Sequence, residues 1–370
     1  KSYGYQVNMG IKMAKGTYVA VLETDDYVDP EMYERLYHLA VQMDCDYVKS
    51  DCFAYWTQEN GERFFFKKRT FFKEELYDKV MEPKRYSETA TYDWYLWPGI
   101  YKKEFLNRNN IWLSETLGAA FQDIGFIFQT NAYAKRALYI KEAYYRYCMD
   151  REGASSNSGK GLQYAYQEFD RLCRMMESSG IIDREIASAL YCRMAKSMIC
   201  CYEGMNTGYS GLADSDRRKY YLWFQKKLKD AIAKDIVNTR NLRPEIWDKL
   251  EILLISEECY LKKIKDHEDY IRKKIGEAKE FLVVIFGCGY YGFSAYRWLK
   301  KQGYSIAAFM DNNKALWGTK VNGIMVEPPV RAKEMPDEVK YLIANEMYSG
   351  EIKEQLLALG ISDNMIGNYV

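Results

Sequence analysis

Apolar positions in the first 150 residues switch repeatedly between a two-residue period and a helical period. Short runs rich in β-branched and aromatic residues predict strands, whereas apolar residues spaced i, i+3, i+4 and i+7 predict amphipathic helices. The expected strands lie at residues 17–22, 46–50, 62–66 and 137–148, and the expected helices at 30–43, 102–108 and 123–136. Strands that alternate with helices in this way predict an α/β domain.

The pattern changes twice farther along the chain. From about Gly161 to Lys279 it is helical almost throughout, and its breaks predict about four helices. Residues 281–286 then open a second series of strand, glycine turn, helix and strand, which is typical of a small α/β domain. The expected domains are residues 1–158, 159–279 and 280–370.

Composition excludes several classes of protein. The 370 residues include 53 Lys and Arg against 52 Asp and Glu, so a general polyanion binder is excluded and no nucleic-acid partner is expected. With only His38 and His267 present, enzymes built on a histidine base are disfavoured. Nine irregularly spaced cysteines indicate reduced thiols and a cytoplasmic location. The apolar run at 281–286 is far too short to span a bilayer.

A basic stretch allows contact with a membrane surface. Residues 217–234 carry seven basic side chains and one acidic side chain, Asp230, beside an apolar stripe. A basic, aromatic helix of this kind could rest on anionic lipid as a peripheral contact. The alternative is a solvated charged face above a stripe that packs into the protein.

The end of the first expected strand is acidic. Asp25 and Asp26 follow the strand directly, with Glu23 just before them, and ligands of open α/β sheets bind beyond the carboxyl ends of strands. Such carboxylates supply hard oxygen ligands for Mg²⁺ or Mn²⁺, which commonly bridges to a diphosphate. The alternative is that Asp25, Asp26 and Asp29 only cap the helix that begins at Pro30.

The segment around this acidic motif resembles family 2 glycosyltransferases. The family pattern is a small loop with Asn-x-Gly-Ile, then Ala-x-Gly-x-Tyr, a hydrophobic strand, an acidic motif and a Pro-led helix. The matching residues are Asn8, Gly10, Ile11, Ala14, Gly16, Tyr18, Asp25, Asp26 and Pro30. The resemblance implies that Asn8 and Asp25 lie on the donor side and that Asp26 holds the metal. Glu23 replaces the family's usual Asp.

A second family mark lies about a hundred residues farther on. In Gln122-Asp123-Ile124-Gly125-Phe126, Asp123 matches the family's general base, whereas Gln122 replaces the usual Glu. An inverting transfer needs one carboxylate to deprotonate the attacking hydroxyl group. The competing interpretation of Asp123 is a helix N-cap.

Three further residues resemble donor-binding positions of the family. Trp97 stands before an Ile-Tyr-Lys-x-x-Phe-Leu element and could stack on a sugar, although burial in the core is an equal alternative. Arg146 and Arg151 lie in the segment that resembles the end of the catalytic domain, and they are candidates for contacts with a diphosphate.

The resemblance covers only the later part of the catalytic fold. The family normally begins with a strand, a loop, a helix and a strand ending in Asp-Asp-Gly-Ser, and none of these precedes Lys1. We therefore expect an N-terminally truncated GT-A domain. Donor binding, and hence activity, would be crippled if the molecule begins at Lys1.

The last domain carries the sequence GCGYYG between a strand and a helix. Gly287, Gly289 and Gly292, with Asp311 at the end of the next strand, form the dinucleotide-binding fingerprint in its usual context. This predicts a small Rossmann-like domain with a nucleotide site. The alternative is that the glycines serve the fold alone. The absence of a Tyr-x-x-x-Lys pair argues against an oxidoreductase.

These observations predict an α/β chain made of an incomplete GT-A domain, a helical middle region and a small Rossmann-like C-terminal domain. The expected function is an inverting, metal-dependent glycosyltransferase that moves a sugar from a nucleoside-diphosphate sugar to a hydroxyl of a cell-surface glycan or lipid-linked acceptor. The alternative is a non-catalytic nucleotide-binding or regulatory module of a polysaccharide-synthesis assembly.

Overall fold

The computed structural model describes residues 2–71, 73–118, 121–150, 159–179, 183–203, 209–276 and 281–370. This chain forms two compact units. The first consists of Lys1–Ala54 and Lys67–Leu261, and the second consists of Tyr55–Phe66 and Lys262–Val370. The three-part division expected from the sequence stays a prediction.

A seven-stranded sheet organises the first unit, and its central path runs β1-β6-β3-β7-β2. β4 pairs with β3, and β5 pairs with β7. The strands are β1 Tyr18–Ala20, β2 Tyr27–Val28, β3 Tyr47–Thr57, β4 Arg63–Lys68, β5 Val80–Met81, β6 Gly99–Lys102 and β7 Ala137–Cys148. The predicted α/β class is therefore confirmed for this part of the chain.

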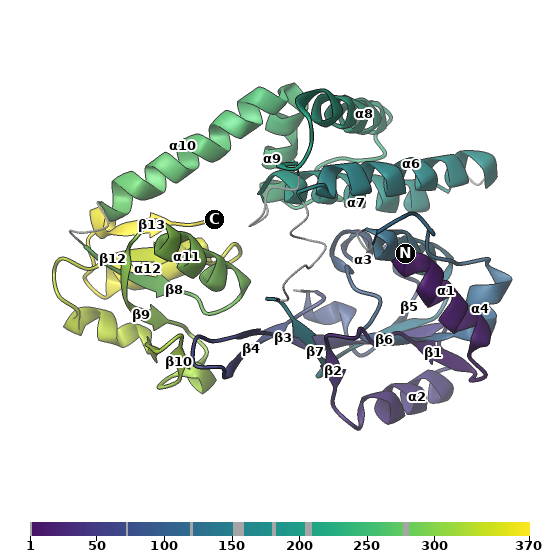
Figure 1. Ribbon diagram of the computed structural model, residues 1–370, viewed down its shortest axis with the longest axis horizontal. Helices are drawn as coiled ribbons and strands as arrows, with labels where there is room; N and C mark the ends of the chain where they lie inside the picture. The colour runs from purple at the N-terminus through teal and green to yellow at the C-terminus, as the bar shows by residue number, and fades with distance from the viewer. Residues whose placement is uncertain are drawn as a thin grey trace. The chain divides into compact units, whose positions relative to one another are not determined.

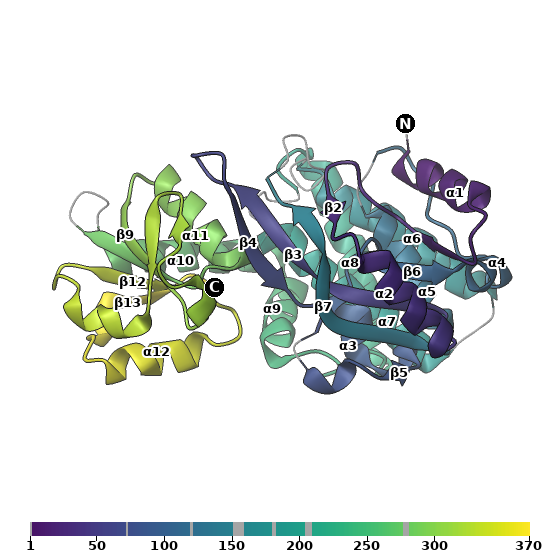
Figure 2. The same cartoon turned by 90° about the horizontal axis from the view of Figure 1, so that it is seen from below.

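Alternation along the strands builds a hydrophobic core on each face of this sheet. Tyr47 and Tyr101 point into one core, whereas their neighbours Val48 and Ile100 point into the other. Helix α2 covers the second core, and helices α1, α4 and α5 cover the first (Figures 1 and 2). These helices are α1 Tyr3–Met13, α2 Met32–Gln42, α4 Lys103–Arg108 and α5 Gln122–Tyr133, with α3 at Ser87–Tyr92.

The start of the chain differs from the expected loop. Residues 3–13 form α1, because Tyr3, Val7 and Ile11 recur every four residues and turn one stripe toward the core. The start of α2 also differs, since the N-cap is Glu31 and the cap predicted at Asp29 is wrong. The carboxylate of Asp29 is instead engaged by Arg146.

The middle region is helical, as expected, but five helices are described there where four were predicted. They are α6 Gly161–Ser179, α7 Arg184–Glu203, α8 Asp214–Ala233, α9 Pro244–Ile255 and α10 Glu257–Ile275. Helix α6 packs against α5 at Gly125, where an added Cβ would lie 1.7 Å from a carboxylate oxygen of Glu168. The middle region thus shares a closely packed boundary with the first sheet.

The second unit contains a six-stranded sheet in the order β10-β11-β9-β8-β12-β13. All neighbours are parallel except β10 and β11. In chain order, the parallel strands are arranged 3-2-1-4-5, which is a Rossmann-like order. Its elements are β8 Leu282–Phe286, α11 Tyr290–Lys301, β9 Ser305–Met310, β10 Lys320–Val321, β11 Ile324–Glu327, β12 Lys340–Ile343, α12 Ser349–Ala358 and β13 Ile366–Asn368.

A hairpin from the N-terminal half of the chain belongs to this second unit. Residues 55–66 lie at the turn between β3 and β4. The buried ring of Trp56 stacks on Phe293 of α11 with centroids 4.0 Å apart, and the Tyr296 hydroxyl donates to Glu59 at 3.1 Å. The core of the second unit therefore includes residues more than 200 positions earlier in the sequence.

Candidate active site

The acidic loop after β1 is held in place by the last strand of the first sheet. The hydroxyl of Tyr145 donates to one carboxylate oxygen of Asp26 at 2.9 Å, and the backbone N–H of Cys148 donates to the other at 2.7 Å. The backbone N–H of Glu23 donates to the same tyrosine oxygen at 3.2 Å. Both ends of the loop are thus fixed to β7.

Glu23 and Asp123 lie close enough to interact electrostatically, although they are a hundred residues apart in sequence. Burial raises the pKa of Glu23 to about 7, and repulsion from Asp123, Asp26 and Asp25 adds to the shift. The hydroxyl of Tyr3 donates to Glu23 at 2.5 Å, and this hydrogen bond opposes the rise in the pKa of Glu23. Glu23 therefore lies near enough to Asp25, Asp26 and Asp123 for their charges to act on it.

Asp123 lies in the first turn of α5. The helix is entered through Phe121, whose φ of 66° is left-handed, and Phe121 takes the N-cap position in place of Asp123. The Asp123 carboxylate accepts from the N–H of Ile124 at 2.9 Å. Burial raises its pKa to about 6, and the charge of Arg193 opposes that rise. A carboxylate with this pKa is ionised at neutral pH yet basic enough to accept a proton.

Arg193 reaches this region from α7 in the helical middle region. Its side chain is buried, donates to the backbone oxygen of Asp93 and lies 4.8 Å from the ring of Trp94. Nothing in the sequence pattern singled out this arginine. Its electrostatic effect on Asp123 makes the middle region part of the site's environment.

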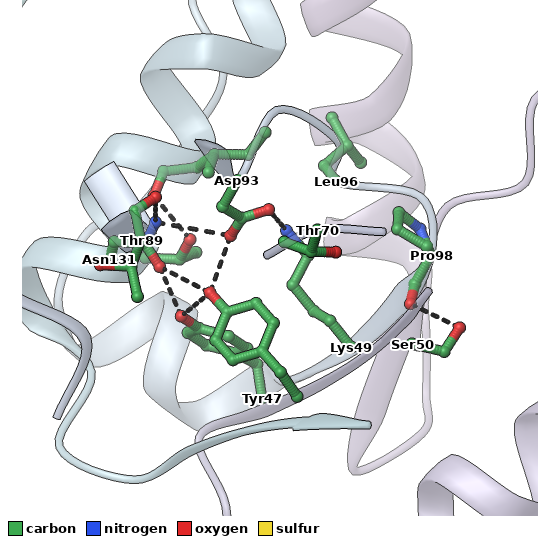
Figure 3. Close-up of polar contacts among 12 residues, drawn as sticks. Tyr47, Lys49, Ser50, Thr70, Thr89, Asp93, Leu96, Pro98 and Asn131 are labelled. Atoms are coloured by element: carbon green, nitrogen blue, oxygen red, sulfur yellow. Dashed lines mark hydrogen bonds and ion pairs between the residues drawn. The ribbon is translucent and has the colours of Figure 1, made fainter. Parts of the chain in front are cut away.

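Asp93, whose backbone oxygen accepts from Arg193, also belongs to a buried polar network. Figure 3 shows this network around Asp93. Lys49 of β3 forms an ion pair with Asp93, and both side chains are almost completely inaccessible to solvent. The hydroxyl of Tyr139 donates to the carboxylate of Asp93 at 2.8 Å, and the side-chain amide of Asn131 donates to the same carboxylate at 3.4 Å. Because a buried ion pair needs such additional hydrogen bonds, the network fixes the segment before β6 against β3 and β7.

Trp97 lies in the core, as the alternative interpretation expected. Its ring stacks on Tyr145 at 4.2 Å and on Tyr147 at 5.0 Å, and its side chain is buried. Tyr145 is the residue that holds Asp26. Trp97 thus supports the acidic loop through its partner ring.

Two further predicted residues use their polar atoms to hold other segments. Asn8 is buried and exchanges two 3.0 Å hydrogen bonds with the backbone of Leu113. Arg146 binds Asp29 at 2.6 Å and lies 4.6 Å from the ring of Phe53. Arg151, the other arginine candidate, lies outside the described residues.

The carboxylates suit a cation that is shared with a ligand. Among the described residues, no group of three or more His, Cys, Asp or Glu side chains is arranged as a metal site. Mg²⁺ is usually bound by one or two carboxylates together with substrate phosphates, so a cage made only of protein ligands is not required. Asp26 fits this role because its oxygens are oriented by Tyr145 and Cys148.

The other predicted site residues lie in the second unit. Gly287 adopts a φ of +116°, and an added Cβ on Gly292 would lie 2.0 Å from the backbone oxygen of Gly287. The carboxylate of Asp311 accepts from the N–H of Cys288 at 2.9 Å and from that of Asn313 at 2.8 Å. Asp311 therefore holds the glycine turn, and Gly289 begins α11 as its N-cap.

The basic helix packs its apolar stripe inward. In α8, the side chains of Tyr221, Phe224, Leu228 and Ala231 are buried. Lys226 and Lys227 form ion pairs with Asp230 and Glu177. This favours the solvated-face alternative, and membrane contact stays a prediction. In the described part of the chain, no helix is both long and apolar enough to cross a bilayer.

Two family models match the chain in separate places. Residues 1–141 match the model described as Glycosyl transferase family 2. Residues 280–367 match the model described as C2185-like, N-terminal. The first match includes both acidic motifs, and the second includes the glycine turn and Asp311.

Curated relatives agree with the first match. The chain is 28% identical over 145 residues to the uncharacterized glycosyltransferase EpsJ of Bacillus subtilis (strain 168), covering 38% of this chain and 40% of the relative. It is 27% identical over 189 residues to the uncharacterized glycosyltransferase YibD of Escherichia coli (strain K12), covering 46% and 49%. These alignments span about half the length of each relative or less.

A solved structure is also similar to the chain. The alignment with the crystal structure of S. aureus TarS 1–349 covers 72% of this chain and 71% of the TarS chain, with 14% sequence identity and a TM-score of 0.49.

Proposed function

Because residues 1–141 match the model described as Glycosyl transferase family 2, we propose that the chain transfers a sugar from a nucleoside-diphosphate sugar to a hydroxyl group, with inversion. The acceptor class is a cell-surface glycan or a lipid-linked acceptor. The observation that carries this proposal is the acidic loop that β7 holds at Asp26, with Glu23 close enough to Asp26 and Asp123 for their charges to raise its pKa.

Asp123 acts as the base in this proposal. Its carboxylate removes the proton from the acceptor hydroxyl as that oxygen attacks the anomeric carbon. Two features support the assignment: its place in the first turn of α5, and a pKa raised by burial to about 6. Arg193 limits that rise, so most of the carboxylate is ionised at neutral pH.

Asp25 and Asp26 bind the donor side. We assign Mg²⁺ or Mn²⁺ to Asp26, where the cation would neutralise the leaving diphosphate. Tyr145 and Cys148 orient the Asp26 carboxylate, and the stack of Trp97 on Tyr145 keeps that tyrosine in place. Glu23, which stands where the family usually has Asp, is anchored by Tyr3.

The test is metal-dependent turnover of nucleotide sugars by the protein, comparing wild type with Asp26→Asn. Asparagine can still accept from Cys148 and can donate to the Tyr145 hydroxyl, so the loop should keep its shape. We expect Mn²⁺-dependent turnover to be lost. Asp44→Asn is the matched control, because Asp44 is exposed and has a φ of 45° that asparagine tolerates. Undiminished turnover by Asp26→Asn would refute the proposal.

A further inference from the structure

The second unit contains a cavity that the proposed transfer reaction does not use. It has a volume of about 540 Å³, which is in the range of small-molecule sites. It opens where β8, β9 and β12 end. Its lining includes Gly287, Asp311, Asn345, Tyr348, Glu351 and Ile352.

The cavity lies where the topology of the sheet favours a ligand. After β8 the chain builds β9 and β11 on one side, and then crosses to build β12 and β13 on the other. A crevice forms at the carboxyl ends of the strands where the order reverses in this way. Strands on both sides of the switch point are present in this domain.

We propose that this cavity binds the nucleoside of a diphosphate-linked nucleotide whose ribose hydroxyls are free. The proposal is independent of glycosyl transfer in the first unit.

The three glycines of the turn are not equivalent. At Gly287, an added Cβ would lie 2.7 Å from the backbone oxygen of Ala344. At Gly292, an added Cβ would lie 2.0 Å from the backbone oxygen of Gly287. The fold itself therefore requires both glycines. Gly289 has a φ of −84°, and an added Cβ would meet nothing within 4 Å. Neither backbone conformation nor packing explains a glycine there. The open space at the start of α11 is where a diphosphate would be stabilised by the helix N-terminus.

The charge of the lining selects the class of nucleoside. Asp311 and Glu351 contribute carboxylates, and the described lining residues include no Lys or Arg. A carboxylate has about four acceptor positions, and the two hydrogen bonds to Cys288 and Asn313 leave Asp311 able to accept from ribose hydroxyls. A phosphate at the 2′ position would be repelled. Tyr348 and Ile352 offer apolar surface to the base.

Helix α11 is fixed from behind by the hairpin. Phe293 and Tyr296 of α11 contact Trp56 and Glu59, respectively. Because the hairpin belongs to this unit, residues 281–370 alone lack part of their core. Binding should therefore be measured on the complete chain.

The experiment is titration calorimetry of the complete chain with NAD⁺, NADP⁺ and UDP-GlcNAc. Wild type is compared with Gly289→Val, which places a side chain in the open space where an added Cβ meets nothing within 4 Å. Gly10→Val is the matched control, because Gly10 also has nothing within 4 Å of an added Cβ but lies in α1. We expect at least one ligand with free ribose hydroxyls to bind, NAD⁺ to bind roughly tenfold or more tighter than NADP⁺, and Gly289→Val to remove this binding.

The three ligands distinguish a dinucleotide from a nucleotide sugar as the molecule that the cavity binds. Loss of NAD⁺ binding in Gly289→Val identifies a dinucleotide, and loss of UDP-GlcNAc binding identifies a nucleotide sugar. The proposal is overturned if nothing binds at millimolar concentration, if NADP⁺ binds better than NAD⁺, or if the only binding survives Gly289→Val. Unchanged thermal unfolding of the variant confirms that a loss of binding is local.

Discussion

At the scale of single residues, the acidic site depends on groups that hold its carboxylates from other strands and helices. Asp26 receives hydrogen bonds from Tyr145 and Cys148, and Glu23 receives one from Tyr3. Each holder lies far from its carboxylate in sequence. The Asp26 carboxylate is oriented before any ligand arrives, as the cation site proposed there requires.

Tyr145→Phe tests this orientation directly. The substitution removes the hydroxyl that donates to Asp26 but keeps a ring to stack on Trp97. Because the loss of one buried hydrogen bond costs about 1–3 kcal/mol, we expect turnover to fall roughly tenfold while the fold survives. Steady-state kinetics against Mn²⁺ concentration would show a higher metal requirement. An unchanged metal dependence would contradict the orienting role.

Arg193 offers a test that depends on pH. The groups that act on Asp123 are Arg193, which lowers its pKa, Glu168, which raises it, and the backbone N–H groups of α5, which lower it. Arg193→Gln removes the favourable charge, so the acid limb of the pH–rate profile should move to higher pH from about 6. Arg193→Lys should largely restore the profile. If both variants lose activity equally at every pH, the arginine is purely structural.

The sequence identified the acidic residues but not the residues that hold them. Asp25, Asp26 and Asp123 stand in local motifs, and a motif can be recognised without knowledge of the fold. Tyr3 contributes a hydrogen bond to Glu23 and Arg193 contributes its charge near Asp123, and local spacing encodes neither. Asn8 and Trp97 show the reverse, since their motifs indicated ligand binding but their side chains are buried within the protein.

At the scale of secondary-structure elements, helix α5, which carries Asp123, is packed tightly against the middle region. Gly125 of α5 faces the buried carboxylate of Glu168 in α6, which accepts from Ser114 at 2.6 Å and is paired with Arg171. Any side chain at Gly125 would collide with this group. Close packing against Glu168 therefore explains why a glycine stands at position 125, independently of any catalytic role.

Gly125→Ala should consequently destabilise the first unit, although alanine favours helices. An added methyl group would displace the Glu168 carboxylate from its buried partners, with a cost of about 1–3 kcal/mol for overpacking. Thermal unfolding followed by circular dichroism would show a lower Tm. Gly10→Ala in α1, where the space is open, should leave Tm unchanged or raise it. Equal effects of the two substitutions would rule out the packing account.

Elements with a strong period of apolar residues were predicted well from the sequence, and short elements were not. Helices α2 and α5 and strand β7 lie within a few residues of their expected places, because each carries several apolar residues in one pattern. Strands β11 and β13 have only four and three residues, so their own sequences contain too little pattern. They form because β9 and β12 present parallel edges for them.

At the scale of the whole molecule, the chain order and the compact units do not coincide. Residues 55–66 include the ends of β3 and β4 in the first sheet, yet they belong to the second unit and contribute Trp56 to its core. No local signal in residues 55–66 indicates a partner beyond residue 262. This is why the sequence placed the hairpin entirely within the first domain.

Trp56→Ala should therefore weaken the second unit more than the first. The indole is 1% exposed and stacks on Phe293 and on Phe64, and truncation of such a buried side chain costs about 3–5 kcal/mol. Hydrogen exchange measured by mass spectrometry should show faster exchange in β8, β9 and α11 and little change in α5. Faster exchange confined to the first sheet would contradict the assignment of the hairpin.

The central claim is that Asp123 is the base of a transfer reaction, and Asp123→Asn tests it most directly. Asparagine keeps the size and much of the hydrogen bonding but cannot take the proton. We expect donor binding to persist and transfer to fall roughly 10²-fold or more. Burial raises the pKa of Asp123 to about 6 in the folded protein, so its ionisation reduces stability as the pH rises through that value. At pH 8 the variant should therefore unfold at a Tm no lower than that of wild type. Undiminished transfer, or a loss of transfer fully matched by a loss of stability, would contradict the account.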